Sequence, residues 1–427
     1  MSPNSLNPSS GFPGLGIAPA LLQALAKLGI HTPTPIQQQA IPFALQGKDI
    51  AGIAQTGTGK TIAYGIPMIQ RLAQVKGQGL VVLPTRELAL QVEEVLRQIG
   101  DHVRTAVLIG GASMSYQVQA LRRNPQIIVA TPGRLNDHLN QRYVKLDNVR
   151  IVVLDEADRM LDMGFAPQLA TIFRGIPKER QTMLFSATMP DGIMRLAAAY
   201  MKVPIRVEVA PTGTLVEGVT QEIFVIHKEA RTRLLDKLLQ EYSGATLIFT
   251  RTKHGASRLV HSIRAMGHAA AEIHSNRSQS QRREALDGFK RGKYRVLVAT
   301  DIASRGIDVV GIGLVLNYDL PDNPEDYVHR IGRTARAGAG GHAISFVAPE
   351  QRREVRDIEQ LIRKTLAVSR LPELPPIRKG APAPAFQAPR PQQRQGAGGG
   401  QFAPRSHHSG GRDSRSGFPD RHRRRRY

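Results

Sequence analysis

Short apolar runs alternate with longer stretches of helical pattern along most of this chain. The runs are rich in β-branched residues, end at turn residues and are mostly continuous instead of alternating. Continuous apolar runs are typical of parallel strands that helices cover on both faces. The runs of the first half are Ile50–Ile53, Leu80–Leu83, Ala106–Ile109, Ile127–Ala130, Ile151–Leu154 and Met183–Phe185. Those of the second half are Ile223–Ile226, Thr246–Phe249, Val296–Ala299, Leu314–Asn317 and Ala343–Val347. The repetition of strand, helix and strand predicts an α/β fold with parallel sheets.

Length and turn residues predict two domains joined by a linker. The chain has 427 residues, more than one ordinary domain, and its hydrophobic share of 41% is enough for packed cores. Between the two groups of runs lies Ala210–Val219, which contains two glycines and a proline. We therefore expect a first domain over residues 1–208, a linker over 209–219 and a second domain over 220–377.

The positive charge is concentrated at the end of the chain. The net charge is +23, and residues 378–427 alone hold 12 basic and 2 acidic side chains. This tail is rich in Pro, Gly, Gln, Ser and Arg, so it buries too little apolar surface to fold, and we expect it to be disordered. Aromatic residues spaced between its arginines favour contact with nucleic acid. The alternative is a solubilising extension without a specific partner.

Several absences narrow the class of protein. No cysteine occurs, which excludes disulfides, Cys-ligated zinc and thiol catalysis and fits a reducing cytoplasm. No apolar run reaches the ~18 residues of a membrane span, and the first residues do not resemble a secretory signal. The 13 histidines show no metal-ligand spacing. Without a signal peptide, the glycosylation pattern at Asn276–Ser278 has no meaning. We expect a cytoplasmic protein that binds polyanions.

A phosphate-binding loop follows the first predicted strand. Ile50–Ile53 leads into Ala54-Gln-Thr-Gly-Thr-Gly-Lys-Thr61, after which a helical pattern begins. Backbone N–H groups of such a loop wrap a triphosphate at the positive end of the helix. Lys60 is expected to reach the β- and γ-phosphates, and the Thr61 hydroxyl to bind Mg²⁺. The residues expected at the nucleotide phosphates are Gln55, Thr56, Gly57, Thr58, Gly59, Lys60 and Thr61. A glycine-rich turn without this function is the alternative, which the strand–loop–helix context disfavours.

An acidic tetrapeptide supplies the second element of an ATPase site. Ile151–Leu154 ends at Asp155-Glu-Ala-Asp158, and ligands of open α/β sheets bind at the carboxyl ends of strands. We expect Asp155 to hold Mg²⁺ through water and Glu156 to orient or deprotonate the attacking water. The alternative is an acidic cluster that merely ends a strand.

Together these motifs resemble those of the DEAD-box ATP-dependent RNA helicases, over about Phe12 to Val347. Gly29–Gln37, with Phe12 seventeen residues before Gly29, resembles the family's adenine-recognising segment. The Gln37 amide has the donors and the acceptor that bidentate reading of adenine requires. The position that is usually aromatic in the family is Ile30, so the resemblance implies an aliphatic contact with the base.

Further motifs of the family occur in order and imply roles for their residues. Ser186-Ala-Thr188 and His329-Arg330 resemble the segments that couple the two domains, with Asp158 as their acidic partner. By resemblance, the RNA-contacting residues are Pro84, Thr85, Arg86, Gly111, Thr131, Arg134, Thr252, Gln279, Arg282 and Thr300. Asp308 is expected at the ATP ribose. Arg333 and Arg336 lie three residues apart and are expected to reach the γ-phosphate from the second domain.

The resemblance implies two tandem RecA-like domains that close on ATP and RNA. RNA contacts to phosphate and sugar would make binding largely independent of sequence. The expected reaction is RNA-stimulated ATP hydrolysis with Mg²⁺, which unwinds short RNA duplexes or remodels RNA–protein complexes. Details at Tyr327–Arg333 and the basic tail resemble the bacterial RhlE-like branch, with ribosome-assembly or RNA-degradation proteins as candidate partners.

Two other functions stay open on the residues alone. A non-enzymatic RNA-binding or annealing protein would keep the basic tail and carry a vestigial ATPase. A DNA translocase on the same scaffold would respond to DNA as strongly as to RNA. The intact Lys60, Glu156, Arg333 and Arg336 favour the enzyme over the annealing protein.

Overall fold

The computed structural model describes residues 11–55, 57–209, 218–301, 309, 311–335 and 340–375. Several expectations fall outside these residues. They concern Thr56, Asp308 and Arg336, most of the linker over 209–219, and the tail over 378–427. Within the described part of the chain, no helix is both long enough and apolar enough to cross a membrane.

Seven parallel strands form the first sheet. Its spatial order is β3-β4-β2-β5-β6-β1-β7, and every neighbouring pair is parallel. The bounds are β1 Ile50–Ile53, β2 Gln78–Val82, β3 Thr105–Leu108, β4 Ile127–Ala130, β5 Val149–Leu154, β6 Gln181–Ser186 and β7 Ile205–Glu208. Because β6 lies between β5 and β1, the carboxyl ends of these three strands meet at one edge of the sheet.

The second sheet repeats the topology of the first. Its order is β10-β11-β9-β12-β13-β8-β14, so its first to seventh strands take the same places as those of the first sheet. The bounds are β8 Val219–Val225, β9 Ala245–Phe249, β10 Ala270–Ile273, β11 Val296–Ala299, β12 Ile312–Asn317, β13 Gly341–Val347 and β14 Ala367–Val368. The predicted α/β fold with two parallel sheets is confirmed, and each predicted apolar run overlaps a strand.

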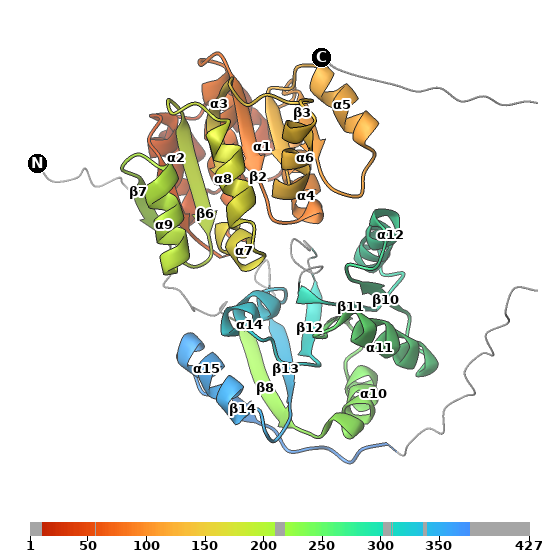
Figure 1. Ribbon diagram of the computed structural model, residues 1–427. Coiled ribbons are helices and arrows are strands. Elements are labelled where there is room, and N and C mark those ends of the chain that lie inside the picture. Colours follow the sequence, from red (N-terminus) through yellow and green to blue (C-terminus); the bar gives the residue numbers. More distant parts are fainter. Residues whose placement is uncertain are drawn as a thin grey trace, which may run out of the picture. The chain divides into compact units, whose positions relative to one another are not determined.

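Helices connect the strands and cover both faces of each sheet (Figure 1). In the first half they are α1 Pro19–Lys27, α2 Pro35–Leu45, α3 Lys60–Leu72, α4 Arg86–Ile99, α5 Met114–Arg122, α6 Pro132–Asn140, α7 Ala157–Asp162, α8 Ala166–Arg174 and α9 Asp191–Tyr200, with the 3₁₀ turn η1 at Phe12–Leu15. In the second half they are α10 Arg231–Glu241, α11 Lys253–Ala265, α12 Gln279–Lys290, α14 Pro324–Ile331 and α15 Arg352–Ile362, with η2 at Lys228–Ala230. Hydroxyl caps begin several of them: Thr85 accepts from Leu88, and Ser278 forms a capping box.

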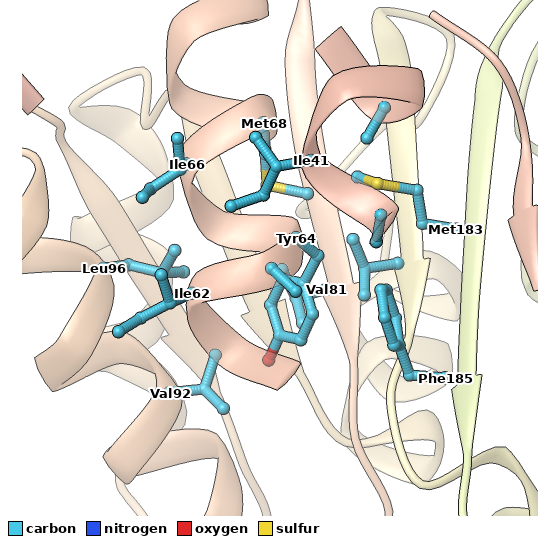
Figure 2. Close-up of a cluster of buried hydrophobic side chains, with 14 of the residues drawn as sticks. Ile41, Ile62, Tyr64, Ile66, Met68, Val81, Val92, Leu96, Met183 and Phe185 are labelled. Carbon is cyan, nitrogen blue, oxygen red and sulfur yellow. The ribbon is translucent and has the colours of Figure 1, made fainter. Parts of the chain in front are cut away.

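Alternate residues of the central strands enter different cores. On β2, Val81 packs into one buried cluster and Leu80 and Val82 into the cluster on the other face. Figure 2 shows the first cluster, where Tyr64 of α3 lies among side chains from the sheet and from α4. Two-faced burial explains why the strands are apolar throughout. It also holds the ends of β1, β5 and β6 rigidly in register for the loops that follow them.

Candidate nucleotide and RNA site

Gly57 and Gly59 give the loop after β1 its shape. Their φ angles are +88° and +89°, in the left-handed region that glycine adopts without a Cβ penalty. The Thr58 hydroxyl donates to the Gln55 carbonyl at 2.7 Å and braces the turn. At the first residue of α3, Lys60 Nζ donates to the Ala54 carbonyl at 3.0 Å, so the buried ammonium is held over the loop.

Gln37 joins the loop to the segment expected at the adenine. Its Nε2 donates to the Gly59 carbonyl at 3.0 Å, and its Oε1 accepts from the Thr34 N–H at 2.9 Å. A second N–H and a second lone pair of this amide remain for a base. Phe12 is one of the buried residues of the first hydrophobic cluster, and Ile30 is partly buried against the same cluster. Phe12 therefore belongs to the core on which this segment packs.

Asp155 faces Lys60 at the end of β5. Its Oδ1 lies 4.0 Å from Lys60 Nζ and accepts from the Glu156 N–H at 2.9 Å. Burial raises the pKa of the Asp155 carboxyl to about 6, and Glu156 adds to the rise while Lys60 opposes it. A buried carboxylate whose charge burial disfavours is a group that a bound cation stabilises.

Tyr64 is a residue of this site that sequence reasoning missed. It lies one helical turn after Lys60, fully buried, and its hydroxyl donates to Asp155 Oδ2 at 3.0 Å. Burial, with Asp155, raises the pKa of Tyr64 well above its ordinary value, so the phenol stays a proton donor. The available clue was its spacing of four residues from the lysine on one helix face.

The side chains near the phosphate loop can be tested for their fit to a nucleotide-bound Mg²⁺ ion. Among the described residues, no group of three or more His, Cys, Asp or Glu side chains gathers in a way that could hold a metal by itself. The loop offers Thr61 and the acidic strand end offers Asp155, which leaves the remaining ligands to phosphate oxygens and water. This division is the usual one for Mg²⁺ at a phosphate site, so the residues present fit the ion.

Asp158 ties the acidic tetrapeptide to the end of β6. Its Oδ2 accepts from the N–H of Ala187 at 3.0 Å, and from the N–H and hydroxyl of Thr188 at 3.1 and 3.2 Å. Ser186 Oγ in turn accepts from the Asp158 N–H at 3.2 Å. Glu156, two residues before Asp158, has a left-handed backbone with φ +51°. The expected coupling residues Asp158, Ser186 and Thr188 thus form one network.

Two contacts lead from this network to the second half of the chain. The Thr188 hydroxyl also lies 3.4 Å from Glu325 Oε2 at the start of α14. Arg159 on α7 forms an ion pair with Asp326, and its side chain is buried. The contacts connect the tetrapeptide to the helix that carries His329 and Arg330.

The expected RNA residues of the first half gather at the ends of β2, β3 and β4. The Arg86 guanidinium packs on Gly110 and Gly111, where a Cβ would collide with it. Arg134 Nη1 donates to the Ala112 carbonyl at 3.0 Å, beside the same glycines. Thr85 caps α4, and Thr131 stands at the start of α6 with its hydroxyl 3.5 Å from the Leu108 carbonyl. Pro84, directly before Thr85, is buried.

A buried pair beneath this surface was also missed. Gln117 Nε2 donates to the carbonyls of Ile109 at 3.0 Å and Ala112 at 3.3 Å, on both sides of the two glycines. His138 Nε2 lies 3.0 Å from Gln117 Oε1. Because an amide oxygen only accepts, this nitrogen carries the proton. Gln117 and His138 therefore brace the glycine turn from inside.

In the second half, the expected RNA residues stand at helix starts and strand ends. Thr252 caps α11 and accepts from the Gly255 N–H at 3.0 Å. Gln279 is the first residue of α12, and Thr300 follows β11. Arg282 is buried, and its Nη2 lies 2.8 Å from Glu87 Oε2 on α4 of the first half. Arg282 thus engages a carboxylate in this conformation.

Arg330 organises the second half from within. Its guanidinium makes two bonds to Asp301, at 2.6 and 2.7 Å, and donates to Asn317 Oδ1 at 3.0 Å. It also lies 5.0 Å from the centre of the Phe249 ring. These partners all belong to the second half, so Arg330 links its strand ends to α14. Arg333 lies just beyond the end of α14 and is buried, and with His329 it lines the same small pocket as Arg159 and Asp326.

Comparison with protein families identifies both halves. A DEAD/DEAH box helicase model matches residues 34–196, and a helicase conserved C-terminal domain model matches residues 230–338. The ATP-dependent RNA helicase CshA of Listeria monocytogenes is 43% identical over 360 residues, which cover 83% of this chain and 69% of that protein. The DEAD-box ATP-dependent RNA helicase CshA of Bacillus subtilis is 43% identical over 368 residues, covering 85% of this chain and 74% of that protein.

Solved structures agree with these matches. Dbp5 of S. cerevisiae bound to RNA and ADP BeF3 superimposes with a TM-score of 0.77 at 29% identity, covering 84% of this chain and 96% of that one. Mss116p bound to ssRNA and AMP-PNP superimposes with a TM-score of 0.78 at 28% identity, covering 85% and 80%. The sheets, the site and the sequence identity lead to one conclusion: the chain belongs to the family of DEAD-box ATP-dependent RNA helicases.

Proposed function

We propose that the protein hydrolyses ATP in response to RNA and uses the cycle to separate short RNA duplexes or to remodel RNA–protein complexes. The observation that carries the proposal is the pairing of Lys60 with Asp155. A buried ammonium and a buried carboxylate stand 4.0 Å apart over a loop shaped by two left-handed glycines. This arrangement supports phosphoryl transfer to water.

Each residue of the loop and the tetrapeptide has a role in the proposal. Lys60 neutralises charge on the β- and γ-phosphates, and the N–H groups of the glycine-rich loop hold their oxygens. When bound, Mg²⁺ supplies Lewis-acid stabilisation of the phosphate charge. Thr61 and Asp155 would hold the ion, Asp155 through water. Glu156 orients the attacking water and takes up its proton.

The adenine and ribose are assigned to residues at the rim of the site. Gln37 reads the base with the donor and acceptor that its contacts with Gly59 and Thr34 leave over. Ile30 lends an aliphatic contact, and Asp308 binds the ribose. Gln37 also links base recognition to the shape of the phosphate loop, because Gly59 directly precedes Lys60.

We assign the coupling between ATP hydrolysis and RNA binding to residues at the ends of β5 and β6. Asp158, Ser186 and Thr188 connect the tetrapeptide to Glu325 and hence to α14. Arg333 and Arg336 stabilise charge on the γ-phosphate from the second half, so hydrolysis requires both halves. RNA lies along the residues assigned to it on both halves and is held through phosphate and sugar, with little dependence on sequence.

The proposal also covers the branch of the family, the cellular location of the protein and its partners. Placement in an RhlE-like bacterial branch rests on Tyr327–Arg333 and the basic tail, whereas the curated relatives cited above carry the name CshA. A cytoplasmic location, and partners from ribosome assembly or RNA degradation, fit an RNA-remodelling enzyme. The domain boundaries at 1–208 and 220–377 and an RNA-binding role of residues 378–427 are part of the same proposal.

Steady-state ATP hydrolysis with different nucleic acids tests this function. We expect single-stranded RNA to raise the rate by at least about tenfold over the rate without nucleic acid. DNA of the same sequence should have little effect, because recognition of RNA uses 2′-hydroxyl groups. Equal stimulation by DNA would favour a translocase. RNA binding and annealing without hydrolysis would favour the non-enzymatic alternative.

A further inference from the structure

Tyr64 contacts Asp155, one of the residues assigned to Mg²⁺. It lies on α3 one turn beyond Lys60, and its ring is fully buried, tilted against Phe185 with centroids 5.4 Å apart. In Figure 2 the Tyr64 oxygen lies at the end of the ring directed away from the apolar core residues Met68 and Ile41. The hydroxyl donates to Asp155 Oδ2 at 3.0 Å.

The direction of this bond follows from proton counting. A hydroxyl has one proton to donate, and an ionised carboxylate has none. The Tyr64 proton therefore goes to Asp155 Oδ2. The other carboxylate oxygen, Oδ1, accepts from the Glu156 N–H and lies 4.0 Å from Lys60 Nζ, so both oxygens of Asp155 are held.

We propose that Tyr64 is a positioning residue for the ATPase reaction: its hydroxyl fixes the Asp155 carboxylate in the orientation that nucleotide-bound Mg²⁺ requires. The inference rests on the proposed function, because it takes Asp155 as a residue that holds the ion. A partner that orients a metal ligand typically accounts for a 10–100-fold effect on metal affinity or activity. Tyr64 thus acts through its neighbours and does not touch the nucleotide.

Replacement of Tyr64 by phenylalanine in the full chain isolates the hydroxyl. The readout is binding of a fluorescent ADP analogue across a titration of free Mg²⁺, with a parallel measurement in EDTA. We expect the half-saturating Mg²⁺ concentration to rise about tenfold in Tyr64→Phe, while affinity in EDTA stays within about twofold of wild type. The kcat of Tyr64→Phe at saturating RNA and ATP should be lower than that of wild type at the Mg²⁺ concentration that saturates wild type. It should recover in part at higher Mg²⁺ concentrations.

Tyr327→Phe is the matched control. Tyr327 is also fully buried, and its hydroxyl donates to Gln221 Oε1 at 3.1 Å in the second half, remote in sequence from the phosphate loop. It should titrate with Mg²⁺ as wild type does. Tyr64→Met fills the space with an adaptable apolar side chain, and the same Mg²⁺ shift is expected.

Three results would overturn the inference. One is a wild-type Mg²⁺ titration in both Tyr64 variants. Another is an equal loss of nucleotide affinity in EDTA, which would assign Tyr64 to the shape of the loop. Failure of both variants to fold would assign it to the core alone. The proposed function fails separately, if the wild-type protein itself shows no Mg²⁺-dependent nucleotide binding.

Discussion

Glu156 combines a strained backbone with the proposed role of orienting the attacking water. Its φ of +51° is unusual for a residue with a side chain and costs about 1–2 kcal/mol, so the neighbouring bonds of Asp155 and Asp158 hold it there. We predict that Glu156→Gln lowers the ATPase rate by at least about 10²-fold and leaves nucleotide and RNA affinities largely intact. Rates and dissociation constants measured on one preparation check this.

The exposed Glu179→Gln is the control for that substitution, and its rate should equal that of wild type. If Glu156→Gln instead lost nucleotide affinity in proportion to rate, Glu156 would belong to binding and not to the orientation of water.

Gly59 has a left-handed backbone and contacts Gln37, the residue proposed to bind adenine. With φ at +89°, a side chain is strained there, and a Cβ would collide with the Gln37 amide. We predict that Gly59→Ala weakens ATP binding at least about tenfold, because the left-handed penalty of about 1–2 kcal/mol adds to the broken contact with Gln37. Equilibrium binding of a fluorescent nucleotide measures this.

Gly244→Ala provides the comparison, since its Cβ would meet open space and its φ is not in the left-handed region. Unchanged affinity in Gly59→Ala would mean that the loop binds nucleotide in another conformation.

At this scale the sequence predicts the residues that form local motifs and misses those that act at a distance. Lys60 and Asp155 were predicted because each follows a strand in a recognisable run. The bond from Gln37 to the Gly59 carbonyl spans 22 residues and depends on how α2 packs on α3. Tyr64 reads as one more apolar position of α3, and only the structure brings its hydroxyl to Asp155.

At the scale of elements, hydrophobic continuity located every central strand but overlooked three of the four edge strands. The strands missed were β7, β10 and β14. β7 alternates apolar with charged residues, and β14 has only two residues. In β10, Glu272 interrupts the apolar pattern, yet it is buried because it pairs with Arg277 and His274. The sequence alone does not show that these ion pairs form and allow the carboxylate to be buried.

The brace formed by Gln117 and His138 predicts a pH dependence. His138 Nδ1 is a buried nitrogen without a hydrogen-bond partner in the described structure, and burial lowers the pKa of the imidazole, with Arg134 adding to the effect. The folded state therefore disfavours the proton. His138 contributes stability above its unfolded pKa of about 6.5, and this is lost as pH falls through its lower folded pKa.

We predict that His138→Gln, which keeps an N–H donor but does not titrate, flattens the fall in melting temperature between about pH 7 and pH 5. Thermal unfolding across this range, for wild type and variant, is the measurement. Parallel curves for the two proteins would show that His138 is not protonated during acid destabilisation.

At the scale of the whole molecule, two sheets with the same strand order carry the residues that we assign to one ATPase site. The predicted parallel α/β fold is confirmed. It could be predicted because it depends on the pattern of apolar residues along the chain, which is visible in the sequence itself. Contacts between the halves, such as Glu87 with Arg282 and Arg159 with Asp326, could not be predicted. Each joins residues more than 160 positions apart, and their charges alone do not specify a partner.

The basic tail leads to a prediction about salt. Residues 378–427 carry 12 basic and 2 acidic side chains and none of the assigned catalytic residues. Deleting them should weaken RNA binding and flatten the plot of log affinity against log salt by about four units, if about six arginines meet phosphates of a single strand. The ATPase rate at saturating RNA should be preserved.

RNA affinity across a salt series, measured for the full and the shortened chain, checks the role of the tail. Parallel slopes would make it a passive extension. A collapse of the saturated ATPase rate would mean that it contacts the catalytic domains.

The most direct test of the central claim, that hydrolysis needs groups from both halves, is the ATPase rate of Arg333→Lys at saturating ATP and RNA. Lysine keeps the charge but lacks the planar guanidinium, so nucleotide and RNA binding should persist. Arginine fingers contribute about 10³–10⁵ in rate, and we predict a loss of at least about 10²-fold. The exposed Arg283→Lys should keep the wild-type rate. Full RNA-stimulated hydrolysis by Arg333→Lys would contradict the account.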